Sequence, residues 1–142
     1  MARDTQRSKL YGWELAHLET ARLLRAEDTV PLGEEGAQAI VQEVWMDYRH
    51  MGRMPIVKIM GSRGRGWTNG RIIKLSSQYL ATQSRWYVLH EMIHSRQGHL
   101  ADHGPEFCAL YAGMLDEYAT GWRPELVGSM KSSGLKVAPR YP

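Results

Sequence analysis

The segment HEMIH holds the residues of this chain that are best suited to metal chemistry. His90 and His94 stand four residues apart, so on a helix both imidazoles lie on one face, about one turn apart. Glu91 then projects about 100° round the helix from His90, where a carboxylate can take a proton from a metal-bound water. The segment therefore predicts a divalent metal site with Glu91 as general base.

Zinc is the ion that this pattern favours, with one ion per chain. Zn²⁺ lowers the pKa of bound water from about 15.7 toward about 7 and polarises the carbonyl that the water attacks. A catalytic zinc usually has three protein ligands and one open position, so a third ligand must follow His94. An imidazole-only site also accepts cobalt, nickel or iron. The candidates for the third ligand are His99, His103, Glu106 and Glu117.

His99 stands five residues after His94. The metzincin pattern needs a glycine three residues after the second histidine and a histidine six residues after it. Those positions hold Gln97 and Leu100, so the metzincins are excluded. We therefore interpret His99 as a loop residue.

His103 opens a second segment, HGPEF, at the entry to the next expected helix. A chain returning there could aim this imidazole at the ion, and Gly104 would let the backbone approach closely. HEMIH followed by HGPEF resembles the SprT-like zinc metallopeptidases, the family of the Spartan protease domain. In that family the histidine of a downstream HGxxF motif is the third zinc ligand.

The resemblance implies a role for each matching position. Glu91 becomes the catalytic base, and Gly104 and Phe107 complete the second motif. Glu106 becomes a helix-start residue. The implied activity is a zinc endopeptidase that hydrolyses a protein or peptide substrate, including DNA-associated proteins. The implied zinc ligands are His90, His94 and His103.

The fold that the resemblance implies is α+β, a zincin-like minimal metallopeptidase domain with helices packed on a small β-sheet around the HExxH helix. The specific match covers residues 86–118 and leaves out the N-terminal helix and the tail. Longer family members often carry a cysteine-rich zinc ribbon, which the single cysteine of this chain cannot form. The spacing from His94 to His103 is also shorter than in Spartan-like members.

Hydrophobic periodicity predicts the elements that must position these residues. Residues 84–97 are apolar on two sides, so the helix that carries HEMIH should be central and buried. A mobile loop, GSRGRGWTNG, joins the two expected strands, and the second strand is the candidate sheet edge for an extended substrate. The tail adds a short helix and a strand at residues 135–138. The other expected helices cover residues 4–26, 37–51 and 105–118, and the two strands cover residues 56–60 and 71–75.

Two residues near HGPEF have alternative interpretations. Asp102 could hydrogen-bond the other ring nitrogen of a ligand histidine, or it could cap the helix that begins at Pro105, which we favour. Cys108 is expected to pack in the core as a small apolar residue without chemistry of its own.

The glycine-rich loop supports a second hypothesis. Arg63, Arg65 and Arg71 surround Trp67 and could contact a phosphate backbone while the indole stacks on an unpaired base. The interpretation as a solvated hairpin loop is favoured. The alternative function is a catalytically inactive, zinc-stabilised module that binds DNA or protein.

Composition sets the remaining expectations. With 142 residues, 43% of them hydrophobic, the chain should fold as a single domain, residues 1–142. A single cysteine excludes an intramolecular disulfide and fits a reducing compartment. No apolar run is long enough for a membrane span or secretion signal, so we expect a cytoplasmic monomer without membrane contact. The net charge of +3 is compatible with DNA contact but does not require it.

Overall fold

The computed structural model describes residues 4–48, 52–61, 65–96 and 102–139. These residues form five α-helices and one three-stranded sheet, which confirms the mixed α+β class. The chain divides into two compact units, residues 29–100 and residues 1–28 with 101–142, and the expectation of a single domain stays a prediction. Among the described helices, none has the length and apolar character needed to cross a membrane.

The unit of residues 29–100 begins with helix α2, Gly33–Asp47. One face of α2 is buried, and its residues recur with helical spacing, as the apolar stripe predicts. The helix begins four residues earlier than predicted and ends at Asp47, followed by Tyr48 in a non-helical conformation. The predicted end at residue 51 lies outside the described residues. The buried face consists of Ala37, Ile40, Val41 and Val44.

Strands β1, Ile56–Met60, and β3, Ile72–Ser76, confirm the two predicted strands and pair in parallel. The glycine-rich stretch, predicted to be a loop throughout, contains a third strand, β2, Trp67–Thr68, which pairs antiparallel with β3. The strand order is β1-β3-β2. The prediction that residues 71–75 form the sheet edge is therefore wrong, because β2 returns to cover that side of β3.

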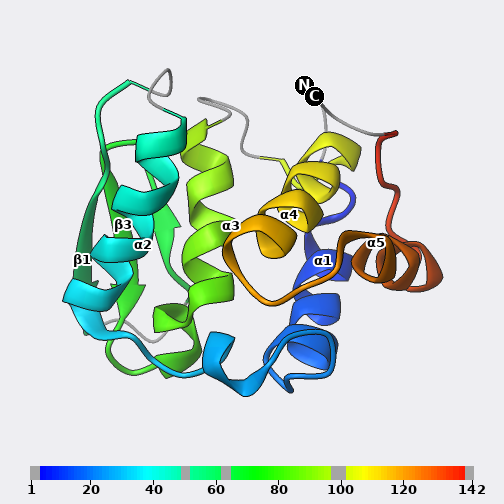
Figure 1. Ribbon diagram of the computed structural model, residues 1–142, viewed down its shortest axis with the longest axis horizontal. Helices are drawn as coiled ribbons and strands as arrows, with labels where there is room; N and C mark the ends of the chain where they lie inside the picture. Colours follow the sequence, from blue (N-terminus) through cyan, green and yellow to red (C-terminus); the bar gives the residue numbers. More distant parts are fainter. Residues whose placement is uncertain (1–3, 49–51, 62–64, 97–101, 140–142) are drawn as a thin grey trace. The chain divides into compact units, whose positions relative to one another are not determined.

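The sheet is covered by helices on one face. In β1 the side chains of Ile56, Lys58 and Met60 are exposed and that of Val57 is buried, as the alternation of a half-buried strand requires. Helix α2 packs on β1, and helix α3, Arg85–Arg96, packs on both α2 and β2 (Figure 1). The segment from residue 86 to residue 93 is buried on all sides, which confirms the prediction for the helix that carries HEMIH.

The other unit begins with helix α1, Arg7–Trp13, which continues as one π-helical turn, η1, Glu14–Leu18. The predicted single helix over residues 4–26 is therefore too long. The chain leaves the helical path after Leu18, and Ala21 adopts a left-handed φ of 59°, which no continuing helix allows. A short 3₁₀ turn, η2, follows at Ala26–Asp28.

Helix α4, Pro105–Tyr118, confirms the predicted helix over residues 105–118, with proline in its first turn. Helix α5, Arg123–Ser132, is the predicted short helix of the tail and packs on α4. The predicted strand over residues 135–138 is wrong. The backbone of this segment pairs with no strand of the described residues. Ala138 N–H donates to the Pro105 carbonyl, and Lys136 N–H donates to the side chain of Gln6.

Candidate metal centre

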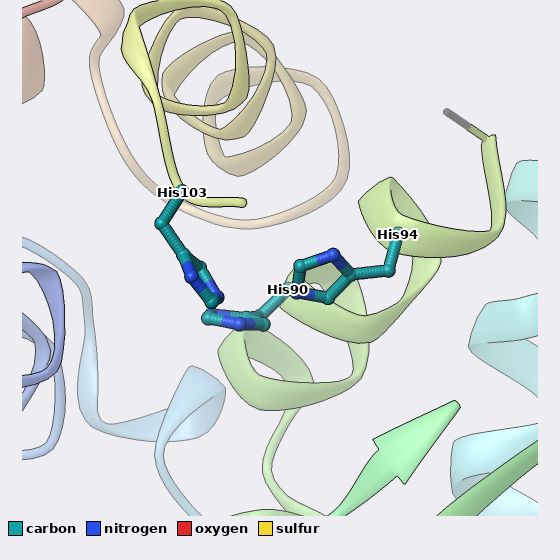
Figure 2. A group of neighbouring side chains, drawn as sticks. All are labelled: His90, His94 and His103. Carbon is teal, nitrogen blue, oxygen red and sulfur yellow. The ribbon is translucent and has the colours of Figure 1, made fainter. Parts of the chain in front are cut away.

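Helix α3 presents the two histidines of HEMIH on one face (Figure 2). The ring centroids of His90 and His94 lie 5.2 Å apart with an angle of 59° between the ring planes. His90 is 1% exposed, and His94 is half-buried. The two imidazoles lie on one face of the helix, as their four-residue spacing predicts, because one helical turn brings them side by side.

Tyr87 supports His90 from the preceding turn of α3. The two rings stack with their centroids 5.9 Å apart and their planes 15° from parallel, and Tyr87 is fully buried. The guanidinium of Arg65 lies over the tyrosine ring, 4.9 Å from its centroid. The tyrosine hydroxyl donates to the carbonyl of Gly66 at 3.4 Å. The glycine-rich segment therefore contacts, through Tyr87, the helix that carries His90 and His94.

His103 belongs to the unit that holds α1 and α4. It lies just before Gly104, the N-cap of α4, and is 4% exposed. Its ring contacts Phe107 edge-on at 4.8 Å between centroids and Tyr11 at 5.3 Å. Gly104 does not provide the close approach that we expected, because its φ is −72° and an added Cβ would meet only the Asp102 carboxylate, at 3.7 Å.

The carboxylate that hydrogen-bonds the His103 ring is that of Asp4. The His103 Nδ1 lies 2.8 Å from Asp4 Oδ2, and the His103 backbone N–H donates to Asp4 Oδ1 at 3.2 Å. Burial raises the pKa of the Asp4 carboxyl, but the hydrogen bonds from the His103 ring and backbone outweigh it, so the pKa lies below its ordinary value. The sequence interpretation missed Asp4, since these residues lie 99 positions apart.

Asp102 fills neither of the roles considered for it. Its side chain is exposed, and the N-terminus of α4 has no side-chain cap, so the favoured capping interpretation is wrong. The aspartate bonded to the His103 ring is Asp4. Adjacency in sequence suggested Asp102, whereas the fold brings the N-terminal segment to the imidazole.

Gln6 ties the backbone around His103 to the C-terminal tail. Its side-chain N–H donates to the His103 carbonyl at 2.9 Å and to the Lys136 carbonyl at 3.2 Å. Its side-chain carbonyl accepts from the Lys136 N–H at 2.6 Å. Because Gln6 is only 7% exposed, these bonds hold the segment that carries His103 in one place.

Three histidines lie near one another and could bind a metal ion. Each offers one ring nitrogen, and these nitrogens all lie within 4.8 Å of one another (Figure 2). Imidazole nitrogens are ligands that suit zinc and related transition metals. The three residues are His90, His94 and His103.

The acidic candidates do not belong to this histidine group. Glu91 is buried, 4% exposed, and Glu106 and Glu117 are exposed on α4. His99 lies outside the described residues. Among the candidates for a third ligand that the structure describes, His103 is therefore the one that lies with the pair on α3.

The remaining predicted residues lie elsewhere. Trp67 is 46% exposed at the start of β2, Arg71 is exposed, and Arg63 lies outside the described residues. Cys108 is fully buried on α4, as predicted for a core residue. Burial raises the pKa of its thiol to about 12, so this group stays protonated near neutral pH.

Comparison of the chain with known protein families, with curated proteins and with solved structures gave no match.

Proposed function

We propose that this chain is a zinc-dependent endopeptidase of the SprT-like, zincin-like type. In this proposal His90, His94 and His103 hold one zinc ion. The observation that carries it is the grouping of these three imidazoles around a helix that bears HExxH.

Glu91 has the position of a general base in this proposal. When bound, zinc supplies Lewis acidity and a water of lowered pKa at the open position. Glu91 accepts the proton of the attacking water, whose oxygen bonds to the peptide carbonyl carbon. As the carbon–nitrogen bond breaks, Glu91 returns that proton to the leaving amine. Its neighbour His90 takes no part in this proton transfer.

The sheet edges favour β2 as the place where an extended substrate binds. The outer edge of β1 is covered, because Val57 N–H donates to Gln38 Oε1 at 2.7 Å and Ile59 N–H donates to Glu34 Oε2 at 3.2 Å. Extended peptides bind an exposed edge through backbone hydrogen bonds, and these two N–H groups are already bonded to α2.

Strand β2 lies beside the end of α3 that carries the second ligand. The Thr68 hydroxyl is 3.3 Å from the hydroxyl of Ser95, the residue that follows His94. A peptide paired with β2 would therefore lie close to this end of α3. Recognition through the backbone implies broad sequence preference and a preference for unfolded protein.

The test of this proposal is Glu91→Gln in the full chain. We expect the variant to bind one zinc ion like the wild type but to cleave casein at least about 100-fold more slowly, the range that general-base loss produces. Glu106→Gln is the matched control, since Glu106 is an exposed glutamate within HGPEF that has no role in the proposed mechanism, and it should cleave at the wild-type rate. Equal cleavage by wild type and Glu91→Gln would defeat the proposed mechanism.

One observation favours the second candidate function, a zinc-stabilised module that binds nucleic acid without catalysis. Trp67 is 46% exposed, and Arg71, also exposed, follows it in the segment that joins β2 to β3. Single-stranded DNA binding that falls steeply with salt, and that Trp67→Ala with Arg71→Ala abolishes, would support this module. Persistence of that binding in the double variant would exclude this surface.

A further inference from the structure

The N-terminal residues Asp4 and Gln6 surround the backbone and ring of His103 with hydrogen bonds. Asp4 contacts both the ring Nδ1 and the backbone N–H, and Gln6 contacts the carbonyl of the same residue. The N-terminal segment therefore hydrogen-bonds the ring Nδ1, the backbone N–H and the backbone carbonyl of His103. This segment precedes α1 and lies outside the part of the chain that carries the two zinc motifs.

We propose that Asp4 is a positioning residue, which holds His103 in the tautomer protonated at Nδ1 and so presents the lone pair of Nε2 to the metal ion. The role of Asp4 in metal binding rests on the proposed function. The tautomer of His103 does not, because it is a property of the metal-free chain. The inference assigns a role in the metal site to a residue that no zinc motif contains.

The chemistry of the contact determines the tautomer. A neutral imidazole carries one N–H, and an ionised carboxylate only accepts hydrogen bonds. At 2.8 Å from Asp4 Oδ2, the Nδ1 of His103 is therefore the donor, and the unprotonated nitrogen is Nε2. Without such a partner, an imidazole distributes its proton over both nitrogens, and a ring protonated at Nε2 cannot ligate a metal through that atom.

Geometry adds a second effect, since the ring has little freedom to rotate. The Asp4 carboxylate bonds two groups of the same residue, so its own orientation is fixed. Tyr11 and Phe107 contact the ring edge-on. A ligand histidine held in this way loses little conformational entropy when it binds an ion, which strengthens binding.

Gln6 anchors the N-terminal segment that carries Asp4. Its side chain bonds the His103 carbonyl and both backbone groups of Lys136, so the segment next to Asp4 is anchored at two distant points of the chain. Movement of Asp4 away from the imidazole would require these bonds to break as well. The carboxylate is thus preorganised for its contact.

The experiment uses the full chain as Asp4→Ala and Asp4→Asn, with Asp102→Asn as matched control. Asp102 is the exposed aspartate adjacent to His103. Long-range ¹H–¹⁵N NMR of the metal-free protein reports which ring nitrogen of His103 carries the proton. Competition with a chelator reports zinc affinity. Asp4→Asn keeps the shape of the side chain and an acceptor oxygen, so it covers the case in which Asp4→Ala does not fold.

We expect Nδ1 protonation of His103 in the wild type and in Asp102→Asn. We expect a mixture of tautomers in Asp4→Ala, with zinc affinity about 10–100-fold weaker, and a smaller loss in Asp4→Asn. A merely structural role would lower the melting temperature without changing the tautomer. The inference is overturned if wild-type His103 is protonated at Nε2, or if the wild type binds zinc and both Asp4 variants bind it as tightly as Asp102→Asn.

Failure of the proposed function gives a different pattern. If the wild type binds no zinc while His103 is protonated at Nδ1 and Asp4→Ala abolishes that preference, then the zinc site is wrong and the positioning of the ring by Asp4 stands. The tautomer measurement therefore separates the two claims.

Discussion

Cys108 shows how burial decides the reactivity of a side chain next to the proposed site. The thiol is fully buried on α4, and the side-chain N–H of Gln6 lies 3.7 Å from its sulfur. Because only the thiolate reacts, a pKa of about 12 leaves almost no reactive species near neutral pH. The residue is a packing residue, as its type and helical setting predict.

Cys108 should therefore resist alkylation in the folded chain. We expect no modification by iodoacetamide in an hour at about pH 8, and complete modification after denaturation in guanidinium chloride, because unfolding exposes the thiol and returns its pKa to the ordinary range. Mass spectrometry of the intact chain measures both. Labelling of the native protein at the rate of a free cysteine would contradict the burial described here.

Local spacing predicts some contacts of the histidines and not others. The pair on α3 follows from a four-residue spacing, which any helix converts into adjacency. Asp4 could not be found in this way, because no local pattern links it to His103 across 99 positions. The choice of Asp102 instead followed from proximity in sequence, which says little about hydrogen bonds made through the fold.

At the scale of elements, the close contact between β2 and β3 depends on Gly66. A Cβ added at this position would lie 2.2 Å from the Lys74 carbonyl oxygen, a backbone atom that cannot move aside cheaply. The residue precedes β2, and its own carbonyl accepts the hydrogen bond of Tyr87, which stacks on His90. The spacing of glycines alone did not reveal this strand, because β2 contains only two residues.

Gly66→Ala should lower the free energy of unfolding by about 1–3 kcal/mol, the usual effect of forcing extra volume into a packed site. Gly128→Ala is the control, because this exposed glycine in α5 has no atom within 4 Å of an added Cβ. There alanine should stabilise the chain by about 0.5–1 kcal/mol. Chemical denaturation measures both changes, and equal stabilities of wild type and Gly66→Ala would contradict the close contact.

Helix α2 protects the outer edge of β1 through Gln38. Its side-chain carbonyl accepts from Val57 N–H at 2.7 Å, and its N–H donates to the Pro55 carbonyl at 3.0 Å. Shortening the Gln38 side chain would therefore remove the partners of both Val57 N–H and the Pro55 carbonyl. Unpaired edges also invite pairing with a second chain.

Gln38→Ala should therefore destabilise the chain by about 1–3 kcal/mol and increase its aggregation on storage. The matched change is Gln42→Ala, an exposed glutamine of the same helix one turn later, which should stay within about 0.5 kcal/mol of the wild type. Unfolding curves and light scattering provide the comparison. If the two variants behave alike, Gln38 does not protect this edge.

Elements were predicted well where the apolar period is long and uninterrupted. The helices now seen as α2, α3 and α4 satisfy that condition, and the strands β1 and β3 lie within one residue of expectation. The first helix was overestimated because apolar residues continue past Leu18, although the left-handed conformation of Ala21 ends the helical path. The prediction of a final strand was wrong because the backbone of that segment bonds to Gln6 and Pro105 in place of a neighbouring strand.

At the scale of the whole molecule, metal binding should contribute to stability. Three buried or half-buried imidazoles near one another favour the folded chain when an ion binds them, because the unfolded chain does not keep them together. At a free zinc concentration about 100 times the dissociation constant, linkage predicts about 2.7 kcal/mol of added stability.

This stabilisation should be independent of catalysis. Zinc should raise the melting temperature of Glu91→Gln as much as that of the wild type, and a chelator should reverse both increases. Differential scanning fluorimetry provides the measurement. A zinc response present in the wild type and absent in Glu91→Gln would show that the glutamate is a ligand, contrary to the role proposed for it.

If His103 completes a metal site with His90 and His94, its removal should abolish zinc binding, and zinc content after equilibrium dialysis measures this. We expect one zinc per chain in the wild type and in the control His17→Ala, whose half-buried histidine lies on η1 outside the group. We expect loss of bound zinc in His103→Ala and in His94→Ala under the same conditions. Retention of one tightly bound zinc by His103→Ala would contradict this expectation.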